Sequence, residues 1–282
     1  GSIENQRILE SGQVDLALIQ AGTSSSEKLA ILAPLFQEAV ILLSKRSSSV
    51  KNVSNLQGRK VILSKPDSGM AYSAQQLLEH FNVSVSEDSP TNVSFTELPN
   101  LDAEATIVTS SILSSSLRQL VRHPDVSIFP IEDAPALAQL NAHLTPFTIH
   151  RSLFGGNPTT PKKDLETIAT TACLVTHSED FSPILAQSAL KAFYESAINN
   201  QFPNLINKDA AMSWDVYPLH PEAKAYFNPY EGLDTLTNFI ESVSGIKELF
   251  FAFGAAVLLF INRLKNRREK ERLADVQRLK DR

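Results

Sequence analysis

Short apolar runs that alternate with helical patterns are the main feature of the chain up to about residue 215. Within these runs, apolar residues either alternate with polar ones or follow one another directly, as in half-buried and fully buried strands. The runs that predict strands are 14–20, 40–44, 60–64, 106–109, 126–130 and 166–175. Helical spacing predicts helices over 3–11, 66–81, 110–121 and 182–199, with a short helix or turn at 208–214. This alternation predicts an α/β architecture with largely parallel sheets.

Beyond this body the pattern changes to one apolar run followed by a basic tail. Residues 249–261 contain no charged residue, but this run of 13 is shorter than the roughly 20 residues that span a bilayer. A helix over 239–264 reaches spanning length, because each helical residue adds about 1.5 Å. We therefore predict a transmembrane helix at 239–264. The alternative is a buried core helix followed by a solvated basic helix.

The charge distribution predicts an orientation. Residues 262–282 carry nine Lys or Arg and four Asp or Glu, a net charge of +5, whereas residues 1–261 carry a net charge of −10. Because basic segments next to a membrane helix stay on the cytoplasmic side, we expect the tail at 265–282 in the cytoplasm and residues 1–238 outside it. The expected location is the inner membrane of a cell, single-pass, with a periplasmic soluble domain. A body this acidic is a poor partner for nucleic acid.

Residue types that support catalysis or metal binding are sparse. Cys173 is the single cysteine and stands in an apolar run, which excludes an intramolecular disulfide and predicts a packing role. No two of the six histidines are four residues apart, so they lack metal-ligand spacing. The chain contains neither a G-x-S-x-G elbow nor a Walker loop. We therefore expect no enzyme activity, no catalytic residue, no metal and no cofactor.

One βα turn has the pattern of an anion site. Ser68 lies between an apolar run and a helical pattern, so its hydroxyl can cap the helix while the first backbone amides point outward. The alternative is an ordinary capped turn. Residues 1–5 can begin the first helix in the same manner, and Gln20 ends the next predicted strand, where ligands of open α/β sheets gather.

Five segments, taken in order, resemble the successive motifs of the TAXI proteins, the TRAP-associated extracytoplasmic immunogenic solute receptors. These segments are GSIEN at 1–5, LESGQVDLALIQ at 9–20, LQGRKV at 56–61, PDSGM at 66–70 and PLHPEAKAYF at 218–227. The resemblance implies a two-lobed periplasmic-binding-protein-like fold of type II. Such a fold closes on a small carboxylate-bearing solute, such as glutamate, another amino acid or a dicarboxylate, and delivers it to a TRAP-type permease. The alternative is a ligand-sensing or interaction subunit on the same fold, docked to a membrane partner.

The resemblance also implies a set of ligand-binding residues. Carried over position by position, they are Ser2, Asn5, Gln20, Ser68, Gly69, Met70, Ser110, Phe154 and Gly155. Phe154 stands where the family often has Tyr. For three of these residues a structural role is the alternative: Ser2 as a helix cap, Gln20 as a surface amide at a strand end, and Phe154 as a core residue.

The resemblance further implies an organisation of the chain into domains. The solute-binding domain is expected at 1–238, with its second lobe at roughly 110–215. The family has an additional strand and helix before the motif at Gly1, so the fold is expected to lack its first strand and helix here. A carboxyl-terminal membrane helix is also unlike a freely diffusing receptor.

Overall fold

The computed structural model describes residues 1–24, 26–179, 181–196, 201–229 and 263. Residues 1–227 form one compact unit, and residues 228–282 form a second. The predicted transmembrane helix at 239–264 and the tail at 265–282 lie outside the described residues, apart from Arg263. In the described part of the chain, no helix combines the length and the apolar character needed to cross a membrane.

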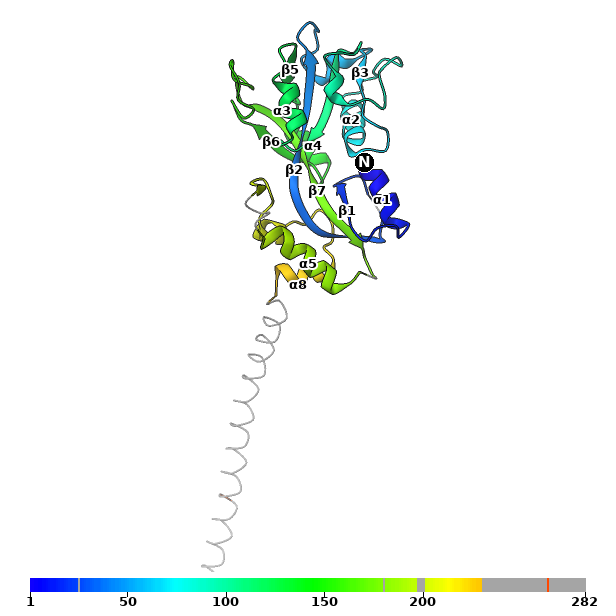
Figure 1. Cartoon of the computed structure of the whole chain (residues 1–282), viewed down its shortest axis with the longest axis vertical. Helices are drawn as coiled ribbons and strands as arrows, with labels where there is room; N and C mark the ends of the chain where they lie inside the picture. Colours follow the sequence, from blue (N-terminus) through cyan, green and yellow to red (C-terminus); the bar gives the residue numbers. More distant parts are fainter. Residues whose placement is uncertain (25, 180, 197–200, 230–262, 264–282) are drawn as a thin grey trace, which may run out of the picture. The chain divides into compact units, whose positions relative to one another are not determined.

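Two long antiparallel strands form the centre of a seven-stranded sheet. They are β2 (Leu29–Lys45) and β7 (Leu165–His177), and Figure 1 shows both passing through the middle of the compact unit. Their register extends from the pair Leu29/His177 to the pair Ala39/Ala169. The other strands are β1 (Ala17–Gln20), β3 (Val61–Ile62), β4 (Ala105–Ser110), β5 (Val126–Phe129) and β6 (Thr145–Ile149).

The prediction of largely parallel sheets is wrong. Only the pair β3/β4 is parallel, and every other described pair is antiparallel. The prediction failed because only the last residues of β2, at 40–44, were recognised as a strand. Pro34 interrupts the first part of β2, and two register shifts between Ile31 and Phe36 accommodate it in the ladder. The long strand therefore has no continuous pattern in the sequence.

Side chains cap the first turns of α2 (Gly69–His80), α3 (Ser115–Val121) and α7 (Lys208–Met212). Ser68 Oγ accepts a hydrogen bond of 3.1 Å from Ala71 N, which confirms the predicted cap of α2. The predicted helix at 110–121 begins later, at Ser115, because Ser114 Oγ accepts from Leu117 N and residue 110 still belongs to β4. The helices are α1 (Ser2–Glu10), α2 (Gly69–His80), α3 (Ser115–Val121), α4 (Ala134–Leu140), α5 (Pro183–Tyr194), α7 (Lys208–Met212) and α8 (Pro221–Phe227), with single 3-10 turns at Val53–Leu56 and Phe95–Glu97.

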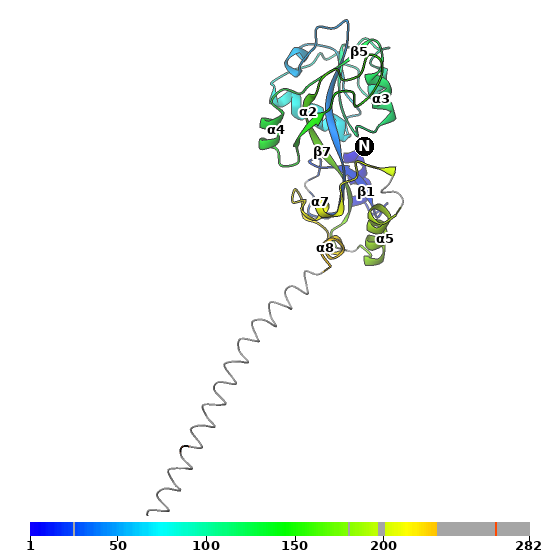
Figure 2. The ribbon, with the colours of Figure 1, turned by 90° about the vertical axis from the view of Figure 1, so that its left-hand side faces the viewer.

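The helices cover both faces of the sheet at each end of β2 and β7. At one end, α2 and α4 pack on one face and α3 on the other, as Figure 2 shows. At the opposite end, α5, α7 and α8 share one apolar cluster, and α1 contributes Leu9 to another. Cys173 lies fully buried in the cluster with Leu9, which confirms its packing role. The proposed lobe limits at 110 and 215 stay a prediction.

Candidate functional site

The first turns of α1 and α2 meet at the end of β1. An added Cβ at Gly1 would lie 2.7 Å from Ser68 Cα, and one at Gly69 would lie 2.5 Å from Gln20 Oε1 and 2.8 Å from Ser2 Oγ. The structure therefore brings together four residues that the sequence suggested: Ser2, Gln20, Ser68 and Gly69. Only glycine fits at Gly69 without moving Gln20 or Ser2. Their role in binding a ligand stays a prediction.

Hydrogen bonds hold Gln20 in this junction. Its backbone N donates to Ser2 Oγ at 3.1 Å, and its side-chain Nε2 donates to Ser73 Oγ of α2 at 2.8 Å. Both Gln20 and Ser73 are only 3% exposed, so this polar pair is buried between β1 and α2. The alternative of a surface amide at Gln20 does not apply, because the side chain is inside the molecule.

Next to this junction, three neighbouring strands change from apolar to polar residues on one face of the sheet. The apolar residues at these three changes pack in the same cluster as Ala74 and Leu77 of α2, so this face of the sheet lies toward α2. Residues two positions apart on a strand share a face, so a polar residue two positions from each of these apolar residues also lies on the face toward α2. The changes are Val40 to Glu38 on β2, Ile107 to Thr109 on β4, and Ile168 to Thr170 on β7. We call Glu38, Thr109 and Thr170 the polar row.

The members of the polar row differ in their hydrogen bonds. Thr170 Oγ1 donates to the carbonyl of Ala21 at 3.0 Å, which ties the end of β1 to β7. Thr109 is 5% exposed, and its Oγ1 has no hydrogen-bond partner among the described residues. A buried hydroxyl without a partner costs about 1–3 kcal/mol. Thr109 is therefore a polar group that a bound molecule can satisfy.

Glu38 is a half-buried carboxyl group at the middle of β2, opposite Thr170. Burial raises its pKa from the ordinary value of 4.5 to about 7. Within the described part of the chain it forms neither an ion pair nor a hydrogen bond with a side chain. Glu38 therefore carries a charge that depends on pH near neutrality and on any cationic group placed beside it.

The remaining predicted residues have different surroundings. Asn5 Nδ2 donates to the carbonyl of Leu18 at 2.7 Å, which fastens α1 to β1. Met70 packs against the apolar cluster of α3. Ser110 ends β4, opposite Ala39. Among the described residues, none of these three side chains forms a hydrogen bond with Gln20 or Ser73.

Phe154 and Gly155 lie in the turn before β7. The Phe154 side chain is 1% exposed and packs in the cluster of α3, which is the core role that the sequence left open. Its carbonyl accepts a hydrogen bond of 2.5 Å from Arg122 Nε. Gly155 has φ +69°, a left-handed conformation that favours glycine. A ligand role for either residue stays a prediction.

Sequence reasoning missed Ser73 and the polar row. Thr109 was read only as the end of a strand, and Glu38 lay outside every predicted element. A signal exists in retrospect. In each of the three strands a polar residue stands two positions from a buried apolar one, on the same face, near the middle of the sheet. The pairing of the strands was needed to show that these positions are neighbours.

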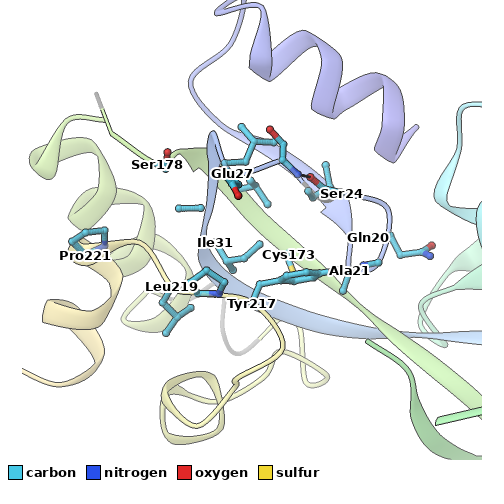
Figure 3. A pocket seen from close by; sticks show the side chains of 17 residues that line it. Gln20, Ala21, Ser24, Glu27, Ile31, Cys173, Ser178, Tyr217, Leu219 and Pro221 are labelled. Atoms are coloured by element: carbon cyan, nitrogen blue, oxygen red, sulfur yellow. Dashed lines mark hydrogen bonds between the residues drawn. The ribbon is translucent and has the colours of Figure 1, made fainter. Parts of the chain in front are cut away.

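A cavity of about 460 Å³ opens beside β1 and is mainly apolar. Ile19, Ile31 and Cys173 line it from the sheet, and Tyr217 closes one side, with its Oη accepting from Gly22 N at 2.9 Å. Figure 3 shows the Gln20 side chain pointing away from this cavity. Burial raises the pKa of the Cys173 thiol far above its ordinary range, so the thiol is unreactive. This cavity offers an apolar surface rather than partners for an ionised solute.

Among the described residues, no group of three or more His, Cys, Asp or Glu side chains is placed to hold a metal ion.

The comparison with protein families adds one finding. The profile of the NMT1-like family matches residues 1–229. The chain belongs to the NMT1-like family. The matched part of this NMT1-like chain includes both the Gln20–Ser73 junction and the polar row.

This NMT1-like chain also has partial similarity to solved structures. One is a substrate-binding protein of an ABC uptake transporter from Streptococcus pneumoniae with bound histidine, at 13% identity and a TM-score of 0.46, covering 78% of this chain and 75% of that one. Another is the periplasmic aliphatic sulphonate binding protein SsuA from Escherichia coli, at 12% identity and 0.44, covering 81% and 66%. A third is the CcmR regulatory domain from Synechocystis PCC6803 in complex with 2-PG, at 10% identity and 0.44, covering 68% and 77%.

Proposed function

We propose that this chain is a membrane-anchored extracytoplasmic receptor that binds a small carboxylate-bearing solute without transforming it. The proposed site lies between the start of α2 and the polar row. One observation supports it above the others. The hydroxyl of Thr109 is buried on the face of the sheet that α2 covers, and it has no hydrogen-bond partner among the described residues. Ordinary core packing does not call for such a group.

The start of α2 suits a carboxylate. The helix has 12 residues, and Ser68 satisfies the amides of Ala71 and Tyr72 through its hydroxyl and its carbonyl. The amides of Gly69 and Met70 have no acceptor among the described residues. Amides at a helix start attract anions, and the helix dipole adds about 0.3–1 kcal/mol. We therefore assign the solute carboxylate to these two amides.

Glu38 favours a solute that also carries an amine. An unpaired carboxyl group in a half-buried position is costly when ionised, and a cationic group nearby removes that cost. An amino acid supplies both a carboxylate for α2 and an ammonium group for Glu38. A dicarboxylate would instead place a second negative charge near Glu38, which disfavours binding when Glu38 is ionised.

The proposal also includes a membrane anchor and a partner protein in the membrane. The charge difference between 1–261 and 262–282 supports a periplasmic domain at 1–238, a helix through the inner membrane at 239–264 and a cytoplasmic tail at 265–282. The resemblance to the TAXI receptors suggests a TRAP-type permease as the partner. The basic tail is the observation that favours the second candidate, a ligand-sensing subunit whose tail docks to another membrane protein.

Isothermal titration calorimetry on the full-length chain in detergent tests the solute site. We expect heat and thermal stabilisation with one or more amino acids, weaker signals with dicarboxylates, and a loss of both in a Thr109→Val variant that remains folded. No binding of any amino acid, dicarboxylate or 2-oxoacid would contradict the receptor function. Binding that persists unchanged in Thr109→Val would move the site elsewhere.

A further inference from the structure

At the end of the compact unit that holds α3 and β5, a groove of about 540 Å³ lies between β5 and residues 156–163. Its lining includes four permanent cations and one histidine, and none of its described lining residues is Asp or Glu. The basic lining residues are Arg46, Arg122, His123, Lys162 and Lys163. We call this feature the cationic groove. It is separate from the polar row and shares no residue with it.

The charges of the groove are not neutralised from within. Arg46, Arg122, Lys162 and Lys163 form no ion pair with any described residue, whereas Lys60 pairs with Asp102 at 2.8 Å. The two arginines are held by backbone carbonyls: Arg46 Nε donates to Val126 O, and Arg122 Nε donates to Phe154 O. Both lysines are exposed. Residues 1–261 carry a net charge of −10, so the groove concentrates positive charge within a chain segment that is acidic as a whole.

Two carboxylates, Asp125 and Asp164, lie close in sequence to the groove. Asp164 accepts from Arg151 N at 2.6 Å and from His150 Nδ1 at 3.3 Å. Asp125 lies 4.0 Å from His123 Nδ1 and has a highly exposed side chain. They reduce the net charge around the groove, but they do not pair with its arginines or lysines.

One wall of the groove is the outer edge of strand β5. Arg46 N donates to Asp125 O at 2.8 Å, in register with the pairs Ser44/Ser127 and Leu42/Phe129. Because hydrogen-bonded pairs alternate along an antiparallel ladder, Ser127 and Phe129 point their backbone groups toward β2.

Val126 and Ile128 therefore point theirs outward. The outward groups of Val126 are used, since its N donates to His123 O at 3.1 Å and its carbonyl accepts from Arg46. The N–H and C=O of Ile128 have no partner in the described part of the chain. The groove thus offers one free backbone pair flanked by cations.

We infer that the cationic groove binds an extended acidic segment of a partner protein. The segment pairs its backbone with Ile128 at the edge of β5 and places carboxylates against Arg122, Lys162 and Lys163. Strand addition to a free edge supplies backbone hydrogen bonds, and charge complementarity selects the segment and speeds its association. Arginine held by a backbone carbonyl keeps its remaining N–H groups in place to meet a carboxylate.

Fluorescence polarisation on the full-length chain with a labelled peptide that alternates Glu with Val tests this inference. The key variant reverses two exposed charges, Lys162→Glu with Lys163→Glu. The matched control reverses two lysines on α5 and α8 that do not line the groove, Lys191→Glu with Lys224→Glu. We expect the groove variant to weaken peptide binding about tenfold or more and the control to leave it within about twofold.

Two further peptides separate the contributions. Replacing the central Val by Pro removes a backbone donor and should weaken binding, and replacing each Glu by Lys should abolish it. Added salt should weaken the binding of the acidic peptide, because it screens the attraction between the peptide carboxylates and the basic side chains of the groove. Thermal unfolding of both double variants shows whether either charge change disturbs the fold.

Several results would overturn the inference. They are the absence of acidic-peptide binding, equal loss in the two double variants, and full binding of the proline peptide. Displacement of the peptide by inorganic phosphate at equal concentration would identify a small-anion site instead. Binding to phosphatidylglycerol vesicles that depends on Lys162 and Lys163, without peptide binding, would identify a membrane contact.

Discussion

The Gln20 side chain donates a 2.8 Å hydrogen bond to Ser73 across 53 residues of sequence. This bond joins the end of β1 to the second turn of α2, and both residues are buried. The backbone of Gln20 is held separately by Ser2. The start of α2 is therefore fixed against β1 by polar groups from three elements. A site built on side chains that are held in this way has little freedom to lose on binding.

Replacing Ser73 by alanine should lower both stability and solute affinity. The buried amide of Gln20 loses its acceptor, which costs about 1–3 kcal/mol of the free energy of unfolding. Urea denaturation measures the stability and calorimetry the affinity. Gln75→Ala, on the exposed face of the same helix, is the control and should change stability by no more than about 0.5 kcal/mol. Equal effects of the two substitutions would contradict a special role of the Gln20–Ser73 pair.

Gly69→Ala should weaken solute binding through a steric effect. The new Cβ would lie within 3 Å of Gln20 Oε1 and Ser2 Oγ, so at least one side chain must leave its position. Ser68→Ala is the comparison, since loss of a helix cap costs about 1 kcal/mol without adding an atom between Gln20 and Ser2. We expect Gly69→Ala to reduce solute affinity, measured by calorimetry, more than Ser68→Ala does. Thermal unfolding should show that the two variants have similar stability. The reverse order would mean that the cap, and not the close approach, matters for binding.

Thr109→Val should separate stability from binding. The hydroxyl has no partner among the described residues, so its removal breaks no hydrogen bond, and valine has nearly the same shape. We expect unchanged or higher stability, by up to about 1 kcal/mol, together with a clear loss of solute affinity. Thr106→Val on the same strand is the contrasting variant, because Thr106 Oγ1 donates to the carbonyl of Ile62 at 3.1 Å. A loss of stability in Thr109→Val would show that its hydroxyl has a structural partner.

Glu38 should make stability and binding depend on pH. Its folded pKa of about 7 exceeds its ordinary 4.5, so the folded state holds a proton that the unfolded state releases between these values. The contribution of Glu38 to stability is therefore fully present below about pH 4.5 and is lost as pH rises through about 7. Because the side chain is partly exposed, we expect a loss of only about 1–3 kcal/mol.

Urea denaturation of the wild-type chain and of Glu38→Gln checks this. The variant should be more stable than wild type at about pH 8, and the difference should shrink at about pH 5. Amine-bearing solutes should bind wild type more tightly as pH rises through about 7, since an ammonium group favours the ionised carboxyl group. A pH-independent difference between the two proteins would show that Glu38 keeps one protonation state throughout.

Cysteine labelling tests the orientation in the membrane. Lys60→Cys and Asp275→Cys, introduced singly, are treated in intact cells with a membrane-impermeant maleimide. We expect position 60 to react from outside and position 275 to react only after permeabilisation, because nine basic residues oppose export of the tail. Cys173 is buried and gives little background. Labelling at position 275 in intact cells would contradict the orientation.

Local features of the fold could be predicted, and strand pairing could not. The helix of α2 follows from Ser68, whose capping pattern is local in sequence. The antiparallel pairing of β2 with β7 does not follow from local sequence, because it joins residues more than a hundred positions apart, such as Ala39 and Ala169. Pro34 also interrupted the apolar pattern of β2. The prediction of parallel sheets failed for these non-local reasons.

The candidate site divides in the same way. Ser2, Gln20, Ser68 and Gly69 were named from short motifs, and the structure brings them together. Glu38 and Thr109 belong to different strands, and their common face follows only from the pairing of Val40 with Thr109 and of Glu38 with Thr170. Phe154 was named from the family resemblance alone, yet its burial depends on residues of α3 and β4 in other parts of the chain.

The shared strands β2 and β7 have a consequence for how the molecule unfolds. Each strand contributes buried residues to apolar clusters at both ends of the unit, with Leu42 in one and Leu35 in another. Melting one end would remove pairing partners and core contacts from the other. The two ends should therefore lose their structure together, in one cooperative transition with coincident loss of secondary and tertiary signals.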